Sequence, residues 1–395
     1  MTTPTDIVLA NLTVPPVRGN VSPLISTKPE HRDGSRPADD PDPQPTQGLI
    51  WQSNIDNEPP WHSGLSENDL GYPTGEPDRI QRATTHTFPQ TFTSCYQDSY
   101  FGESQGNPGG IEAITFLEPG TGRNGSKAIR MARESYDPTG DGRYFASDST
   151  LAKVLSEEEE RSALYIEFWI KFPENWDTTP NQQSKIFRVS SWNRSGSEFQ
   201  AFTGGNLGPI FVYDWTASSY GLRNGMYFRG GPHGQNYSMI GRIDDLPYQM
   251  SAGSLGDLPL NWTNHQVGAK KDGTSPQVPD RVNGGYILDN PGQIVTHAQV
   301  VGTAWNKFAF WLQMNSAPGI RDGVVRQWFN DEEIFYNEKV EWIPAGNYAM
   351  PKWNLVAVGG NDNFNVYPNS EKHQESYLID GNGIVVRDSI PEDLL

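Results

Sequence analysis

Two stretches of the 395-residue chain alternate apolar and polar side chains: residues 163–172 read ALYIEFWIKF, and residues 305–314 read WNKFAFWLQM. In the first, every second residue from Leu164 to Phe172 is apolar, and the same holds in the second from Phe308 to Met314. Successive side chains of a β-strand point to opposite faces, so a period of two predicts a strand with one buried face. Each stretch is therefore predicted to be a half-buried strand.

Working outward, further strands are predicted where apolar runs lie between turn-forming residues. They cover residues 110–117, 127–134, 184–192, 209–214, 225–230, 323–330, 353–359 and 384–387. Only residues 150–162 suggest a helix, because Ser156 and the glutamates at 157–160 place a cap and negative charge where a short helix could begin. A solvated run of charge is the alternative. Ten or more short strands joined by Gly-, Pro- and Asn-rich loops predict one all-β jelly-roll sandwich over residues 80–395.

The N-terminal segment differs from this body, because residues 1–60 hold 11 of the chain's 31 prolines. Proline is excluded from helix interiors and central strands, so residues 1–79 are predicted to form an extended arm. Short apolar groups such as Val14, Leu24 and Trp51 alternate with polar spacers. We expect the arm to bind neighbouring subunits of an oligomer or larger assembly. The alternative is that it wraps its own sandwich and covers an open sheet edge.

Composition excludes several classes of protein. Lys and Arg total 30 against 48 Asp and Glu, a formal charge of −18, which argues against binding nucleic acid through a broad basic surface. No apolar run approaches the roughly 20 residues of a membrane-spanning helix. The single thiol, Cys95, has no partner for a disulfide within the chain. The first residues, MTTPTDIVLA, lack the basic region of a secretory signal, so classical export is not expected.

One segment, residues 226–237 (MYFRGGPHGQNY), carries the side chains that a polysaccharide lyase needs. β-Elimination requires a cation or amide to neutralise the uronate carboxylate, a base for the C5 proton and an acid for the leaving oxygen. The candidates are Tyr227, Arg229, His233, Gln235 and Tyr237, with Arg188 and Lys307 on adjacent strands. A surface loop without a catalytic role would also explain the high glycine content of this segment, and that alternative remains open.

The polar faces of the predicted strands indicate a second set of candidates. Aromatic rings stack on the C–H faces of sugars while neighbouring polar groups bind hydroxyls. The predicted carbohydrate-binding residues are Trp169, Lys171, Trp192, Trp311, Gln313, Arg326 and Trp328. Outer loops that fold over the same face would instead give these aromatic residues a structural role.

Three other patterns have ordinary structural explanations. Residues 120–125 (GTGRNG) match a dinucleotide-binding pattern, but an alternating strand follows, so a hairpin loop is predicted. Residues 137–142 and 361–363 concentrate oxygen ligands as calcium sites do, although Asx-rich turns explain both. The seven histidines are scattered without zinc-site spacing. No cofactor is expected, and calcium is the one ion that these loops suggest.

The segment at residues 305–336 resembles the paired strands of concanavalin A-like domains. A Trp-containing strand leads through an Asn315-to-Gly319 loop and an Asp322-Gly323 turn to a strand with Trp328 and Asn330. Residues 377–380 and 384–386 resemble the final strand of that fold, although residues 381–383 (GNG) are an insertion. Similar strands occur in alginate and glucuronan lyases, in laminin-G-like lectin modules and in jelly-roll proteins of tailed phages. The likeness covers residues 160–390 and implies a concanavalin A-like jelly roll.

Together these features favour a structural protein of a tailed-phage virion, either a capsid decoration or a tail-associated adhesion component. A fold with a sugar-binding face and an assembly arm fits a protein of a phage particle. Such a particle is released by cell lysis, so its proteins need no export signal. Its expected partners are other virion subunits and a glycan, with no nucleic acid and no membrane. The alternative is an extracellular polysaccharide lyase acting on uronate-containing glycans.

Overall fold

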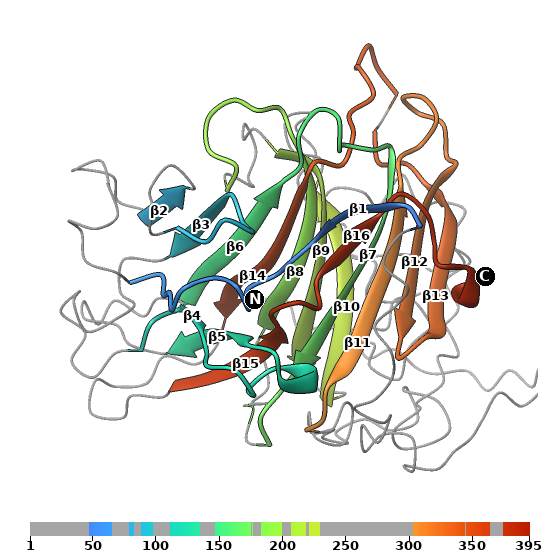
Figure 1. Cartoon of the computed structure of the whole chain (residues 1–395). Coiled ribbons are helices and arrows are strands. Elements are labelled where there is room, and N and C mark those ends of the chain that lie inside the picture. Colours follow the sequence, from blue (N-terminus) through green and yellow to red (C-terminus); the bar gives the residue numbers. More distant parts are fainter. Residues whose placement is uncertain are drawn as a thin grey trace, which may run out of the picture.

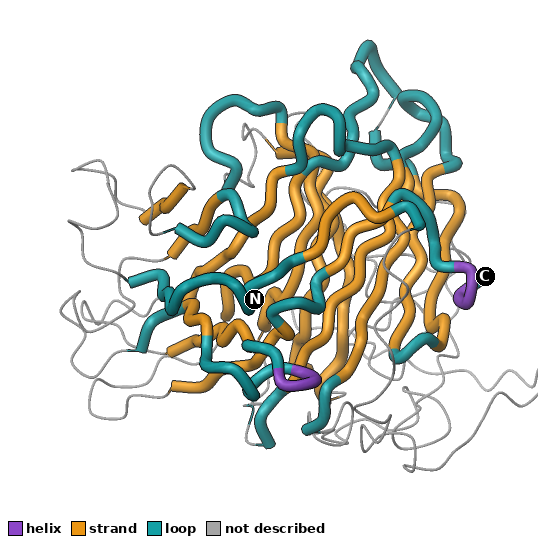
Figure 2. Tube along the Cα trace, in the orientation of Figure 1, coloured by secondary structure: helices purple, strands orange, loops and turns teal. Residues whose placement is uncertain are grey.

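The computed structural model describes residues 47–64, 79–82, 88–97, 111–134, 147–174, 176, 183–199, 207–218, 221–229, 303–343, 345–363 and 374–395. These residues form an all-β body, in which helix occurs only as two short 3-10 turns, η3 (Arg123–Gly125) and η8 (Glu392–Leu394) (Figure 2). None of the helices in these ranges is long and apolar enough to cross a membrane.

The first layer, sheet A, is nine-stranded and antiparallel in every pairing (Figure 1). Its main path runs β13-β12-β11-β7-β15-β5-β4, with β16 beside β7 and β1 beside β16. The strands are β1 (Leu49–Gln52), β4 (Ile114–Phe116), β5 (Ala128–Glu134), β7 (Ala163–Lys171), β11 (Asn306–Gln313), β12 (Gly323–Phe329), β13 (Glu332–Val340), β15 (Gln374–Asp380) and β16 (Val385–Arg387).

The second layer, sheet B, is seven-stranded and runs β10-β9-β8-β14-β6-β3-β2, again antiparallel. Its strands are β2 (Arg79–Arg82), β3 (Ser94–Gln97), β6 (Ser147–Val154), β8 (Gln183–Trp192), β9 (Leu207–Ser218), β10 (Gly221–Arg229) and β14 (Leu355–Asn363). Two antiparallel sheets stacked in this way confirm the concanavalin A-like jelly-roll sandwich expected from the sequence.

Aromatic rings join the two sheets at the centre of the core. Phe168 of β7 and Phe310 of β11 stack on Phe187 of β8, with ring centroids 4.8 and 6.0 Å apart. Phe211 and Tyr213 of β9 lie against Phe310, each at 5.1 Å. All five side chains are fully buried, so the alternation that predicted β7 and β11 is also what places their rings between the sheets.

The predicted strands are confirmed, with boundaries shifted by a few residues. The one predicted helix, at 150–162, is wrong: residues up to Val154 form β6, which pairs with β14 and β3. Beyond β6, Glu159 accepts a hydrogen bond from the Ser156 amide at 2.8 Å, and Ser156 O accepts from the Glu159 and Glu160 amides. This cap closes a single turn before β7 begins. Residues 120–125 form the predicted hairpin loop, since β4 and β5 pair antiparallel on either side.

Part of the segment assigned to the arm packs into the sandwich. β1 pairs with β16, so strands near the two ends of the chain lie side by side in Figure 1. Ile55 and Trp61 are 0% and 2% exposed and belong to the core. Residues 47–64 therefore behave as the alternative interpretation describes, covering their own sandwich. Residues 1–46 lie outside the described residues.

The central ring stack makes Phe310 a sensitive position for stability. We expect Phe310→Ala to lower the free energy of unfolding by about 3–5 kcal/mol, because it removes a ring that contacts both sheets and leaves a cavity. Ile320→Ala is the control, since Ile320 is 49% exposed and its loss should change stability by no more than about 0.5 kcal/mol. Urea titration followed by tryptophan fluorescence measures both. Equal midpoints for the two variants would contradict this account of the core.

Candidate functional site

The face of sheet B that points away from the central core, here called the outer face of sheet B, has an apolar floor. The floor is a cluster of buried residues separate from the core: Ala152, Ile210, Val212, Leu355 and Ala357. The half-buried Val154, Trp192 and Phe199 pack against this cluster. These residues come from β6, β9 and β14, on both sides of β8. With Trp192 at the end of β8, the outer face of sheet B therefore brings four strands to one apolar surface.

Strand register aligns three members of the predicted lyase set across this face. Arg188 of β8 pairs with Ala357 of β14 and Val212 of β9, and Val212 pairs with Tyr227 of β10. In the adjoining row Ser190 pairs with Ile210, which pairs with Arg229. Cross-strand partners occupy the same face of a sheet, so these backbone positions form two neighbouring rows. His233, Gln235 and Tyr237 lie outside the described residues.

A glycine pair in β14 accommodates the Arg188 side chain. A Cβ at Gly360 would lie 2.8 Å from Arg188 Nη2, so no side chain fits there without moving the guanidinium. Gly359 has φ +86°, and the pairing of β14 with β8 shifts register between Val358 and Asp362. Positive φ at this bulge is the conformation that glycine adopts without strain. The half-buried guanidinium thus lies against the backbone of Gly360 at the edge of the apolar floor.

Hydroxyl groups form an unexpected part of the same face. The side-chain oxygens of Ser94, Thr150 and Ser190 are buried and have no hydrogen-bond partner in the described part of the chain. Ser94 pairs with Ala152 and Ser190 with Leu355, which places both in the rows of the outer face. Leaving a buried hydroxyl unpaired costs about 1–3 kcal/mol. Sequence reasoning missed these residues. The available signal was a Ser or Thr at a strand position that the alternation assigns to the polar face.

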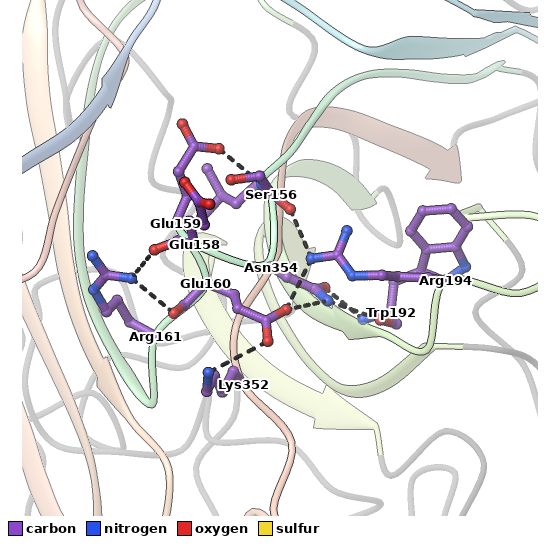
Figure 3. A network of polar contacts seen from close by, with 10 residues as sticks. Ser156, Glu158, Glu159, Glu160, Arg161, Trp192, Arg194, Lys352 and Asn354 are labelled. Atoms are coloured by element: carbon purple, nitrogen blue, oxygen red, sulfur yellow. Dashed lines mark hydrogen bonds and ion pairs between the residues drawn. The ribbon is translucent and has the colours of Figure 1, made fainter.

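Trp192 stands at the end of β8, where the outer face meets a network of polar contacts (Figure 3). Its indole Nε1 donates to Ser195 O at 3.1 Å, and its backbone binds the Asn354 side chain. Glu160 is the centre of the network: it accepts hydrogen bonds from Arg194 at 2.9 Å and Asn354 at 3.5 Å and lies 3.5 Å from Lys352 Nζ. The network ties the turn before β7 to the segments that flank β8 and β14.

The charges around Glu160 govern its ionisation. Burial alone would raise the pKa of this carboxyl, but hydrogen bonds from Arg194 and Asn354 and the charges of Arg194 and Lys352 together lower the pKa below its usual 4.5. Glu160 is therefore ionised at neutral pH and holds both cations at this end of the sandwich.

The other predicted carbohydrate-binding residues lie on sheet A, and contacts within the chain cover two of the tryptophans there. The Arg123 guanidinium stacks 3.5 Å above the Trp169 ring, which is 6% exposed. Trp328 is 1% exposed, in a cluster with Tyr165 and Ala309 against which Ile390 and Leu394 pack. Neither ring presents an open face to solvent.

The rest of this set is less enclosed. Trp311 is half-buried beside the same cluster as Trp328. Arg326 forms an ion pair with Glu333, and Lys171 and Gln313 are half-buried. Their proposed role in binding sugars stays a prediction.

Two sequence predictions about the site are wrong. Lys307 does not lie on a strand adjacent to Tyr227 and Arg229, because β11 belongs to sheet A while β10 belongs to sheet B, and Lys307 forms an ion pair with Asp331; Arg188 shares their sheet, with β9 between β8 and β10. Residues 361–363 are the end of β14 and not a loop, because their partners in β6 and β8 continue the ladder. Among the described residues no group of three His, Cys, Asp or Glu side chains could hold a metal ion. Residues 137–142 lie outside those ranges.

No protein-family model matches the sequence, and no curated protein is significantly similar to it. Similar solved structures include an alginate lyase bound to an alginate tetrasaccharide (10% identity, TM-score 0.40, 87% of this chain and 98% of that one). Others are an endo-β-1,4-glucuronan lyase from Trichoderma reesei (10%, 0.37, 70% and 87%) and a carbohydrate esterase from the Shiga toxin-encoding bacteriophage phi24B (12%, 0.30, 70% and 87%). These neighbours act on carbohydrates. Because their identities are only 10–12% and their TM-scores 0.30–0.40, the fold is assigned from the two sheets described above.

The network around Glu160 predicts a pH-dependent contribution to stability. A carboxyl whose folded pKa is depressed stabilises the fold above its unfolded pKa, and the contribution is lost as the pH falls through the folded value. Glu160→Gln should therefore lower stability at pH 7, by no more than about 1 kcal/mol, and the difference from wild type should shrink below about pH 4.5. Melting temperatures from pH 3 to 7 measure it. Glu157→Gln, in the same turn but exposed, is the control, and a pH-independent Glu160→Gln difference would contradict the account.

Proposed function

We propose that this protein binds an acidic polysaccharide on the outer face of sheet B. The observation that carries the proposal is the register that sets Arg188, Tyr227 and Arg229 in two adjacent rows across β8, β9 and β10. Arginine is suited to carboxylates because its planar guanidinium donates two parallel hydrogen bonds. In this proposal Arg188 binds a uronate carboxylate of the polysaccharide.

The composition of the face supports a sugar ligand. A polysaccharide offers hydroxyl groups along its length and C–H surfaces on its rings. The buried side-chain oxygens of Ser94, Thr150 and Ser190 have no partner in the described part of the chain, and in this proposal they exchange hydrogen bonds with such hydroxyls. The half-buried indole of Trp192, which packs on the buried apolar floor, would contact the C–H surfaces.

The acidic charge of the whole chain is compatible with an anionic ligand. A formal charge of −18 repels a polyanion at long range, but screening limits that repulsion to about 8 Å at physiological ionic strength. Affinity then depends on the few cations at the contact and not on the net charge. We expect a modest affinity that is specific for carboxylated chains over neutral ones.

Binding alone and cleavage are both consistent with this face. A lyase would additionally need a base at C5 and an acid for the leaving oxygen, for which Tyr227, His233 and Tyr237 are the sequence candidates. Incubation with alginate and glucuronan while the ultraviolet absorbance of the unsaturated product is followed separates the two. We expect binding without product. Accumulating product would establish the lyase alternative.

The proposed setting is a tailed-phage virion, in which residues 1–46 would attach the sandwich to neighbouring subunits. Residues 47–64 are fixed to the body, since the Asp388 amide donates to Gly48 O and Arg387 donates to Gln47 O. The arm would thus extend from a fixed point beside the C-terminal strand.

Deleting residues 1–46 tests the proposed arm while leaving β1 and its contacts intact. We expect an unchanged melting temperature, because no described contact of the core is removed, together with loss of oligomers or of attachment to particles. Differential scanning calorimetry and light scattering measure the two effects. A truncated protein that melts markedly lower but still assembles would show that the arm belongs to its own fold.

The ligand-binding proposal predicts that the two sheets respond differently to loss of an arginine. Arg188→Gln should weaken binding to alginate or glucuronan by about tenfold to a hundredfold, because a hydrogen bond to a charged group contributes about 1.5–3 kcal/mol. Arg188→Lys should lose part of the same binding affinity, because lysine keeps the positive charge but lacks the two parallel donors of the guanidinium. Isothermal titration calorimetry measures both.

The matched comparison is Arg326→Gln, which removes a half-buried arginine of the competing sugar-binding set predicted for sheet A. It should leave the affinity unchanged. If Arg326→Gln abolished binding while Arg188→Gln had no effect, the binding face would be on sheet A and the proposal would be wrong. Circular dichroism of each variant establishes that it is folded.

A further inference from the structure

The backbone of Trp192 lies at an interruption of sheet B. The pairing of β8 with β9 shifts register between Ser190 and Trp192, and β14 pairs with β8 only from Leu355 onward, opposite Ser190. At Trp192 the strand β14 therefore no longer supplies a peptide group as hydrogen-bond partner. Without another partner, the amide and carbonyl of Trp192 would lose their ladder contacts.

The side chain of Asn354 takes the place of that missing peptide group. Its Oδ1 accepts a hydrogen bond from the Trp192 amide at 2.7 Å, and its Nδ2 donates to Trp192 O at 2.8 Å (Figure 3). Asn354 is 4% exposed, and its own backbone continues the sheet by donating to Ser190 O and accepting from the Leu155 amide. A primary amide has the donor and acceptor arrangement of a peptide, so the two bonds hold Trp192 as a strand would.

The surrounding charges orient this amide. Asn354 Nδ2 also points to Glu160 Oε2 at 3.5 Å, which fixes the nitrogen on the side of the carboxylate. Arg194, held at φ +58°, donates to Glu160 Oε2 and to Leu155 O. The indole of Trp192 is held separately by its bond to Ser195 O. Both the backbone and the ring of this half-buried residue are therefore fixed before any ligand arrives.

We propose that Asn354 is a positioning residue that holds the Trp192 indole as a stacking platform for a sugar ring at the end of the outer face of sheet B. The inference rests on the proposed function and adds a residue that does not itself touch the ligand. A platform fixed in advance avoids the entropy cost of ordering a side chain on binding. The ligand chemistry that it selects is the C–H face of a pyranose ring, in the same polysaccharide chain as the sugar whose carboxylate Arg188 binds.

A double-mutant cycle tests whether Asn354 acts through Trp192. Asn354→Ala should weaken binding of an alginate oligosaccharide roughly three- to tenfold in the wild-type background. In the Trp192→Ala background the same substitution should have no further effect on affinity, because the platform is already absent. Calorimetric titration gives the four dissociation constants, and thermal melting gives the stability of the same four proteins.

Asn315→Ala is the matched control for a purely structural effect. Asn315 is 2% exposed, and its side chain also binds one backbone residue through both ends, accepting from the Ile343 amide at 2.9 Å and donating to Ile343 O at 3.0 Å. It follows β11 of sheet A, away from the outer face of sheet B. We expect Asn315→Ala and Asn354→Ala to lower the melting temperature similarly, with only Asn354→Ala changing affinity.

The outcomes separate this inference from the proposed function. If the wild type binds and Arg188→Gln weakens binding while Asn354→Ala binds as the wild type does, the positioning role is wrong and the proposed function stands. Equal loss of affinity from Asn354→Ala with and without Trp192 also overturns the positioning role. If the wild type binds no acidic glycan, both fail.

Discussion

The stacking of Phe168 and Phe310 on Phe187 is the contact on which the rest of the structure depends. It is where sheet A meets sheet B, and it fixes which residues of β8 face inward. With Phe187 and Val189 in the core, strand alternation sends Arg188 and Ser190 to the outer face. A shift of register by one residue would bury the guanidinium and expose the ring, so the hydrophobic core determines the chemistry of the opposite face.

Segments remote in sequence cover two of the candidate tryptophans on the outer face of sheet A. On sheet A, the turn around Arg123 lies over Trp169, and the C-terminal residues Ile390 and Leu394 pack on the cluster that holds Trp328. On sheet B, the Arg188 guanidinium lies against Gly360 of the glycine bulge, and three buried hydroxyl oxygens have no hydrogen-bond partner among the described residues. Burying polar groups without partners costs free energy, so the hydroxyls of the outer face of sheet B are a physical reason to test it for a ligand, although buried polar atoms without a described partner also occur on sheet A, at Arg130 and Arg387.

Local alternation allowed the sequence to predict most strands, whereas features that depend on distant partners could not be predicted. β7 and β11 were recognisable because each carries an unbroken apolar stripe. β6 was mistaken for a helix, because its apolar pattern is short and a capping turn follows it at Ser156. The burial of Ile55 depends on contacts with segments far along the chain that no local pattern reveals.

The same limit applies to the site. Residues 188, 227 and 229 could be selected by their chemistry, and the register then placed them in neighbouring rows. Trp169 and Trp328 had suitable chemistry too, but segments remote in sequence cover them. The role of Asn354 depends on an interruption of the β8 ladder, which is visible only in three dimensions.

The most direct test of the account is to map the contact face by hydrogen exchange and mass spectrometry, with and without an alginate oligosaccharide. The account predicts slower exchange on binding in peptides that cover residues 186–196 and 352–357, which line the outer face of sheet B. Protection confined to β7, β11 and β12 of sheet A, or no protection anywhere at saturating oligosaccharide, would contradict it.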